Sequence, residues 1–387
     1  MPLRPPPSSV ARAHPVRVRP AGGLVDAAYV QRLSQIGRAN GLDHVGIAPA
    51  SVFDRARSAL IQRKADGLAD TMQFTYRNPQ RSTDPSATLP SAQSLVVAAR
   101  SYMIEQPPRP AGPMAAVARY AWVDHYESLR VGLRAVGAQL KADGYRAVVV
   151  ADDNAIVDRE SAWLAGLGWF GKNANLLMPG VGSYFVLGCV ITSAPLPALA
   201  EPLPDGCGAC QRCLDACPTQ AIIAPGVVHA GRCLAWILQR PGIIPVQFRA
   251  ALGDRLYGCD DCQTVCPPSV RSERRSAQPA AGPMDAWVAV LQLLAASDTE
   301  LLDRYGRWYI ADRNPIWLRR NALVVLGNIG DPTDGEVVGT LKDYVGHAEP
   351  ALRAHAVWAA ARLGLRSLLP ESDPDPDVQR ELVAALQ

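Results

Sequence analysis

The sequence predicts an α/β fold that carries a cysteine-rich insert and ends in a set of α-helical repeats. Three observations support this prediction. Apolar runs that suit buried strands alternate with amphipathic helical segments over residues 24–200. Eight of the nine cysteines fall within residues 207–266. From about residue 285 the pattern is helical, and one motif recurs there.

The first part of the chain predicts helices and strands in alternation. Helices are expected at residues 27–39, 124–143 and 160–166, and Gly41 follows the first of them as a stop signal. Strands are expected at residues 44–47, 95–99, 146–151 and 184–192. No glycine-rich dinucleotide fingerprint follows a strand, and no P-loop occurs. The sequence therefore argues against a Rossmann or P-loop nucleotide site.

The bulk composition excludes several classes of protein. A net charge of +3 is too weak to indicate nucleic-acid binding by itself. No apolar run is long enough for a transmembrane helix, and the N-terminus lacks the apolar segment of a secretory signal. We therefore expect a cytoplasmic protein without a membrane partner. Residues 1–23 are rich in Pro and Arg, which predicts a disordered tail, with a phosphate-binding arm as the alternative.

The cysteine spacing is typical of a ferredoxin with two 4Fe-4S clusters. Cys207, Cys210, Cys213 and Cys217 form C-x2-C-x2-C-x3-C, followed by Pro218. In this pattern three thiolates bind one cubane and the fourth binds the other. A shorter second half follows, and Cys233 lies between the halves. Structural zinc is the alternative, but zinc motifs space their cysteine pairs differently.

The pseudo-twofold relation between the halves assigns ligands to both clusters. The first cluster is predicted to take Cys207, Cys210, Cys213 and Cys266. The second is predicted to take Cys217, Cys233, Cys259 and Cys262. Cys189 remains, and its apolar surroundings predict a core residue. Two clusters relay electrons, so the rest of the chain must hold their receiver, and an unidentified low-potential donor must supply them.

The C-terminal repeat predicts a HEAT-like helical module. Residues 318–330 align with residues 352–364, with Leu, Arg, Ala and a closing Gly in register. Arg319, Arg320 and Arg353 stand at the starts of the repeated helices, where backbone N–H groups favour phosphates. The alternative is that these arginines only stack and cap between repeats.

Together with these features, residues 152–173 and 257–263 make the chain resemble the epoxyqueuosine reductase family. The first segment contains Asp152, the pair Asp158-Arg159 and then AGLGWFGKN; the second reads YGCDDCQ. Weaker matches lie at residues 76–78, 83–85 and 119–120. Residues 119–126 depart from the family pattern R-Y-A-R-G-x-D-Y-H, because Trp122 replaces an arginine and the order of His125 and Tyr126 is exchanged.

The resemblance implies the last step of queuosine biosynthesis, the reduction of epoxyqueuosine at the wobble position of a tRNA anticodon stem-loop. It implies base-off cobalamin, as cob(II)alamin, beside the nearer cluster, and Asp152 as the catalytic acid. It further implies a corrinoid or substrate pocket lined by Tyr102, Lys172, Asn173, Ser183 and Asp260. The resemblance places cobalamin in residues 24–200, the clusters in 201–275 and tRNA binding, through Arg319, Arg320 and Arg353, in 285–387. A monomer is the simplest expectation.

Several alternatives remain open from the sequence. A reductive dehalogenase-like corrinoid enzyme would use the same cofactors on a small molecule, and an electron carrier would need no corrinoid. Asp152 could instead cap the helix that follows it, and Asp153 competes for either role. If Asp152 is the acid, burial against an apolar corrin face should raise its pKa. Trp163 and Trp169 are expected in the core rather than as stacking platforms.

Overall fold

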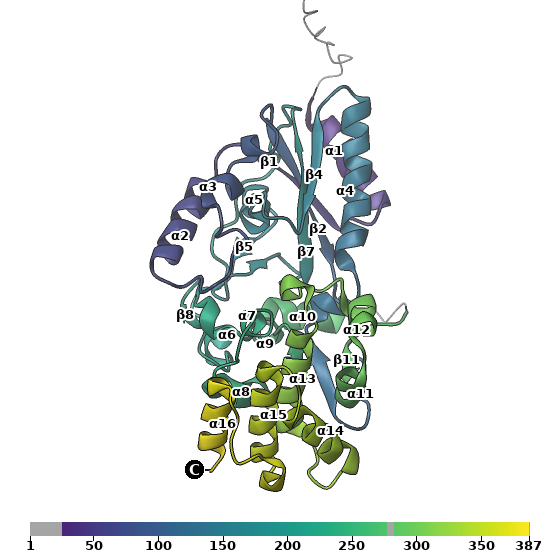
Figure 1. The fold of residues 1–387 in the computed structure, drawn as a ribbon. Helices are drawn as coiled ribbons and strands as arrows, with labels where there is room; N and C mark the ends of the chain where they lie inside the picture. The colour runs from purple at the N-terminus through teal and green to yellow at the C-terminus, as the bar shows by residue number, and fades with distance from the viewer. Residues whose placement is uncertain (1–24, 277–281, 387) are drawn as a thin grey trace, which may run out of the picture.

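The computed structural model describes residues 25–276 and 282–386. A four-stranded sheet with the order β1-β2-β7-β4 occupies the upper part of the molecule (Figure 1). Its strands are β1 (His44–Pro49), β2 (Ser94–Ser101), β4 (Ala147–Ala151) and β7 (Phe185–Thr192). All three pairings are antiparallel. The predicted mixed α/β fold is confirmed, and its central sheet is wholly antiparallel.

Helices cover both faces of this sheet. On one face lie α1 (Ala27–Ala39) and α4 (His125–Ala142); on the other lie α2 (Asp54–Ala65), α3 (Pro79–Ser82) and α5 (Asp158–Leu164) (Figure 1). Along β2, Val96 packs toward α1 and α4, whereas its neighbours Leu95 and Val97 pack toward α2 and α5. Because both faces are covered, the strand is apolar at every position from Leu95 to Ala99, as its sequence predicted.

The predicted elements of this domain match the observed ones to within two or three residues. The ends of α4 carry caps, since the Asp124 side chain accepts a hydrogen bond from the Glu127 N–H at 2.9 Å and Asp143 is the C-cap. Cys189 is fully buried in β7, which confirms it as a core residue. Trp163 and Trp169 are only partly buried, so neither is a full core residue. A small hairpin pairs β5 (Trp169–Phe170) with β6 (Leu176–Leu177).

A second, three-stranded sheet crosses the predicted domain boundaries. Its order is β10-β3-β11, from Arg255–Tyr257, Met114–Val117 and Trp287–Ala289. Residues 115–122 share one hydrophobic core with residues 234–257 and 286–385. The predicted contiguous domain 24–200 therefore lends a strand to the lower unit. Local sequence did not reveal this, because the pairing partners lie about 140 to 170 residues apart and register is not a local property.

The cysteine-rich segment consists of short elements with little apolar core of their own. Its helices are α6 (Arg212–Asp215), α7 (Leu234–Ile237), α8 (Val246–Leu252), α9 (Asp261–Thr264) and α10 (Pro267–Ser276). Its other regular elements are β8 (Ile222–Ala224), β9 (Val227–Val228), the 3-10 turn Ala230–Arg232 and β10, which belongs to the second sheet. This segment lies between the sheet domain and the C-terminal helices (Figure 1).

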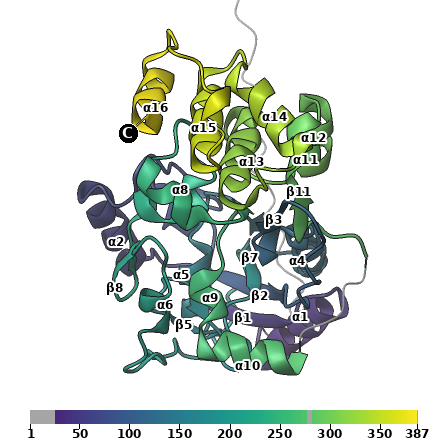
Figure 2. The same cartoon turned by 90° about the horizontal axis from the view of Figure 1, so that it is seen from below.

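The C-terminal part is helical, as predicted. It contains α11 (Val290–Ala295), α12 (Asp298–Tyr305), α13 (Ile316–Ile329), α14 (Gly335–Val345), α15 (Pro350–Arg362) and α16 (Pro376–Leu386). The two aligned sequence segments fall on α13 and α15, which pack directly against each other (Figure 2).

Further 3-10 turns lie at Pro85–Ala87, Arg119–Ala121, Ala311–Arg313 and Arg366–Leu368. Among the described residues, no helix combines the length and hydropathy needed to cross a bilayer.

Candidate active site

The structure arranges the eight clustered cysteines in two groups. Burial raises the pKa of the Cys266 thiol, and the charges of Cys207, Cys213 and Cys210 raise it further. We call these four residues the first cysteine group.

The remaining four cysteines, which we call the second cysteine group, respond to one another in the same way. Burial raises the pKa of Cys262 well above its ordinary value, and Cys259 and Cys233 add to the shift. Burial also raises the pKa of Cys233, and the charge of Cys217 acts in the same direction. The charge of Cys213 also raises the pKa of Cys262, so the two groups lie next to each other.

Neither group is arranged for a single metal ion. Within residues 25–276 and 282–386, no three His, Cys, Asp or Glu side chains converge in that way. A zinc ion gathers four thiolates around one centre, whereas a cubane spreads them over separate iron corners. A cubane therefore needs its thiolates further apart than a zinc ion does.

The second cysteine group adjoins a set of acidic and aromatic side chains in the sheet domain. Arg159, in the first turn of α5, lowers the pKa of Cys233, and Asp260 raises that of Cys262, in each case after the larger effect of burial. Asp260 and Arg159 also act on Tyr102, whose pKa burial raises well above its ordinary value. For Cys213 and Cys266, by contrast, the charged groups that shift the pKa are all cysteines of the first group. The second group is therefore the one that faces this region.

Asp152 lies in the loop between β4 and α5. Its backbone is left-handed, with φ of 54°, which is unusual for a residue with a side chain and is found at functional sites. Its side chain makes no hydrogen bond to any described residue and borders a cavity of about 360 Å³ with Arg130, Arg134 and Val149. Asp152 is exposed at the surface of its loop, yet desolvation by the surrounding protein atoms raises the pKa of this carboxyl against the opposing charge of Arg130, and Asp124 and Asp153 raise it further. The shift has the predicted direction.

The sequence left open which of Asp152 and Asp153 has a local structural role, and in the structure it is Asp153. Its Oδ1 accepts a hydrogen bond from the Ala155 N–H at 2.7 Å, which closes the turn after β4. The residue at the N-cap of α5 is Val157, and no side chain caps that helix. Asp152 is therefore not a capping residue, and its carboxyl is available to a ligand.

Three buried polar atoms in the region of Tyr102 and Tyr126 lack partners among the described residues. They are the Tyr184 hydroxyl, the His125 Nε2 and the Asp158 Oδ1. The Tyr102 ring centroid lies 5.4 Å from that of His125 and 5.8 Å from that of Tyr184. Each unpaired buried polar group costs about 1–3 kcal/mol, so a concentration of them indicates a site that a polar ligand completes.

Sequence reasoning did not select several residues that the structure brings to this site. Burial raises the pKa of Tyr126, and the charges of Asp152 and Asp158 raise it further. Burial likewise raises the pKa of Tyr257 to about 12, with a smaller contribution from Asp152. Burial lowers the pKa of His125 to about 4, so its ring is neutral at physiological pH. The pair Asp158-Arg159 was visible in the sequence, but nothing indicated that its side chains face the site.

Comparison with known proteins identifies the cysteine-rich segment and the whole chain. Residues 206–269 match the 4Fe-4S double cluster binding domain family. Over 334 residues the chain is 32% identical to the epoxyqueuosine reductase of Bacillus cereus, covering 84% of this chain and 86% of that protein. The chain belongs to the epoxyqueuosine reductase family.

Solved structures of epoxyqueuosine reductases share this fold. One, a crystal structure with an epoxyqueuosine-modified tRNA-Tyr stem loop, has a TM-score of 0.83 at 29% identity and covers 93% of this chain and 98% of its own. Another, from Bacillus subtilis, has its aspartate-bearing catalytic loop swung out of the active site, with a TM-score of 0.81 at 28% identity; it covers 93% of this chain and 98% of its own.

The pocket residues implied by the family resemblance join the sheet domain to the cysteine-rich segment. The Asn173 Nδ2 donates to the Cys262 carbonyl at 3.1 Å, and the Ser183 hydroxyl donates to the Gln263 Oε1 at 2.9 Å. Asp260 accepts from the Arg119 N–H at 2.7 Å. The Lys172 Nζ donates to the Gly208 carbonyl at 2.7 Å. These side chains therefore fix where the cysteine groups sit relative to the site.

The residues of segment 119–126 that depart from the family pattern pack into the protein interior. Trp122, which stands where the family pattern has an arginine, is buried, and its Nε1 donates to the Val117 carbonyl at 2.7 Å. Arg119 remains as an interior cation, paired with Glu273 at 2.7 Å. The exchanged His125 is buried beside Tyr102, and Tyr126 faces the acidic loop.

The three arginines predicted to bind tRNA are engaged within the protein. Arg320 is fully buried, and its guanidinium donates to the carbonyls of Arg240 and Gly242, each at 2.7 Å. The expectation that Arg320 contacts phosphate is therefore wrong: its helix start is covered by the loop after α7. Arg353 forms a bidentate ion pair with Asp373, and Arg319 forms an ion pair with Asp298. Arg319 and Arg353 thus make contacts within the C-terminal helices, close to the alternative named above, whereas Arg320 joins those helices to the cysteine-rich segment.

Proposed function

We propose that this protein reduces the epoxide of epoxyqueuosine in tRNA to give queuosine. The observation that carries the proposal is Asp152, a carboxyl with a raised pKa and no hydrogen-bond partner among the described residues, whose charge acts on Tyr126 and Asp158 of the candidate site. Membership of the epoxyqueuosine reductase family supplies the reaction. We further infer a cytoplasmic protein whose helices α11–α16 form a HEAT-like array.

The cofactors follow from the same arrangement. Each cysteine group, as defined above, would bind one 4Fe-4S cluster, in agreement with the double cluster family match. The unpaired polar atoms of His125, Tyr184 and Asp158 fit a large ligand with many amide groups, such as base-off cobalamin. Tyr102 would contact the same ligand, with Lys172, Asn173, Ser183 and Asp260 forming the wall toward the clusters. Reduced cobalamin would supply a strong two-electron nucleophile of very low potential.

The chain's own residues would then supply a proton to the departing oxygen. Conversion of an epoxide to an alkene releases the oxygen as water and consumes two electrons and two protons. The departing oxygen needs a donor that is still protonated near neutral pH. Desolvation raises the pKa of Asp152, so a larger fraction of this carboxyl is protonated there than for an ordinary aspartate. Because no described residue competes for its proton, Asp152 would serve as the general acid.

We place the tRNA contact at the rim of this site rather than at Arg320. Tyr309 is 56% exposed, and its N–H donates to the Tyr257 hydroxyl at 2.8 Å. The charge of Asp152 reaches Tyr257, so Tyr309 stands close to the acidic loop. The adjacent Asp312 and Arg313 have left-handed φ angles of 52° and 50°, a strain typical of binding loops. An exposed tyrosine ring can stack on an unpaired base. Arg319 and Arg353 would first have to leave their carboxylate partners.

The test is direct conversion of the modified nucleoside. Anaerobic protein with both clusters and cobalamin is incubated with a low-potential reductant and tRNA from cells that accumulate epoxyqueuosine. Mass spectrometry of the digested tRNA should show cobalamin-dependent loss of one oxygen. Asp152→Asn should slow this loss by about 10²–10⁴-fold, while Asp153→Asn, which keeps the turn, should retain it. No conversion by protein with verified clusters and corrinoid would refute the tRNA assignment and favour a small-molecule reductase.

A further inference from the structure

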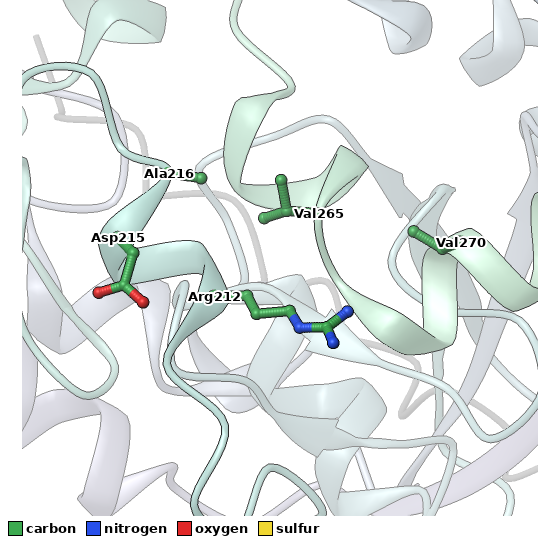
Figure 3. Close-up of a pocket in the computed structure, with 5 residues that line it drawn as sticks. All are labelled: Arg212, Asp215, Ala216, Val265 and Val270. Atoms are coloured by element: carbon green, nitrogen blue, oxygen red, sulfur yellow. The ribbon is translucent and has the colours of Figure 1, made fainter.

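A hollow of about 490 Å³ lies on the outer side of the cysteine-rich segment. It is lined by Arg212, Asp215 and Ala216 of the α6 region and by Val265 and Val270 of α9 and α10 (Figure 3). We propose that this face is the docking surface for a small acidic electron-carrier protein of low potential, which reduces the cluster of the first cysteine group. The proposal rests on the cluster assignment made above.

The position of the hollow fits the entry point of electrons. Arg212 directly precedes Cys213 and Val265 directly precedes Cys266, so two predicted ligands of the first group lie at its edge, beside one of the second group, Cys217, which follows Ala216. The second group instead adjoins Tyr102 and Asp260. A donor at the hollow would therefore face the outer cluster, with the inner cluster between it and the pocket. The order donor, first group, second group, pocket is the order that a relay requires.

The charge of this face selects an acidic partner. Arg271, Arg274 and Arg275 are exposed on α10, and Arg212 is exposed on α6. None of them forms an ion pair with another described residue. Residues 277–281, which follow α10, contain no charged residue. Glu273 is engaged by Arg119, so Asp215 is the one carboxylate among the residues that line the hollow.

The geometry of α10 directs these arginines outward. Ser269 and Ser272 are buried, and the Ser269 hydroxyl accepts from the Ser183 N–H at 3.3 Å. Gly182 permits this approach, because a Cβ there would lie 2.5 Å from the Ser269 Cα. Arg274 follows Val270 by four residues and so stands on the same side of the helix. Figure 3 shows the Arg212 side chain extending across the hollow toward Val270.

The mixture of apolar centre and basic rim favours a protein over a nucleic acid. Ala216, Val265 and Val270 offer side chains that a protein interface can cover, whereas a phosphate backbone would gain nothing from them. Figure 2 shows α6 and α10 well apart from α14 and α15. Small, charge-steered interfaces of this kind suit transient electron-transfer complexes, in which rapid encounter matters more than affinity.

The test compares two reductants on the same holoprotein. The variant is Arg274→Glu with Arg275→Glu, and the matched control is Lys64→Glu with Lys141→Glu, which makes the same charge change at exposed positions on α2 and α4. A reduced acidic plant-type ferredoxin is the protein donor, and reduced methyl viologen is the small one. The readouts are the rate of cluster bleaching and the affinity of the oxidised ferredoxin, both at low salt.

We expect the Arg274/Arg275 variant to lose about 10-fold or more in ferredoxin-driven bleaching and to bind ferredoxin more weakly, because steering of this size is common. Bleaching by viologen should be unchanged, the lysine control should match the parent, and added salt should slow the parent's reaction with ferredoxin. Equal ferredoxin rates in parent and arginine variant would overturn the proposal. Weaker tRNA binding with unchanged ferredoxin rates would identify an RNA surface instead. Failure of viologen-driven tRNA conversion in the parent would refute the proposed function, since docking is measured without it.

Discussion

Two buried polar regions of this molecule differ in how their charged and ligand-like groups are paired. Between the cysteine-rich segment and the C-terminal helices, the buried Arg249, Arg320, Asn321 and His355 all have partners, and the buried atoms left unpaired there are the Asn328 Oδ1 and the Trp317 Nε1. Around Tyr102, by contrast, His125, Tyr184 and Asp158 each keep a buried atom without a partner among the described residues. Buried polar groups that are paired hold parts of a protein together, whereas unpaired ones are retained where a ligand completes them.

The largest effect that would test this difference is on chemistry. Asp152→Asn removes the proton donor but keeps the shape, so turnover should fall about 10²–10⁴-fold. The free energy of unfolding should barely change, because the Asp152 side chain makes no hydrogen bond to a described residue. Single-turnover conversion of modified tRNA and urea unfolding measure the two quantities. A large loss of stability in this variant would place Asp152 in the structural region instead.

The next effect is on the paired region. Arg320→Ala leaves the carbonyls of Arg240 and Gly242 unpaired in the interior, so the free energy of unfolding should fall by about 3 kcal/mol or more. Arg353→Ala is the comparison, because its pair with Asp373 lies nearer the surface and should contribute about 1 kcal/mol. Chemical denaturation of the clustered protein measures both. Equal losses would show that burial of Arg320 adds nothing.

A third measurement concerns the rim between the two regions. Tyr309→Ala removes an exposed ring and should weaken binding of the anticodon stem-loop by about 1–3 kcal/mol, the usual contribution of one stacked base. Tyr309→Phe should bind as the parent does, because the ring is kept. Titration of labelled stem-loop into the holoprotein provides the affinities. Unchanged binding in the alanine variant would exclude Tyr309 from the RNA contact.

The smallest effect is a dependence of stability on pH. Burial raises the pKa of Asp158 well above its ordinary value, so the folded state holds a proton that the unfolded chain has already released. Stability from this group is therefore lost as the pH rises above the ordinary aspartate pKa. Asp158→Asn should remove that loss and raise the free energy of unfolding at neutral pH by about 1 kcal/mol. Urea titrations of the cofactor-free protein at pH 5 and pH 8 should show it. A parent whose stability rises over this range would contradict the assignment.

The sequence predicted what depends on local spacing. The intervals between cysteines anticipated the two groups whose thiols act on one another in the structure, although their ligand roles stay a prediction. Continuous apolar runs gave β2 and β7 because those strands are covered on both faces. Contacts that join distant parts of the chain were not predictable. Nothing local marks Met114–Val117 as a partner of Arg255–Tyr257, or Arg320 as the residue that closes the loop after α7.

The path of β3 also orders events during synthesis. Its partner β11 ends at Ala289, so the second sheet cannot be completed until roughly 170 further residues have left the ribosome. At about 5–20 residues per second this takes roughly 10 to 30 seconds. The eight cysteines, at residues 207–266, emerge in the second half of that interval, while the second sheet is still incomplete. The late pairing of β3 with β11 therefore leaves a period in which iron–sulfur delivery machinery can reach the thiols before the chain closes over them.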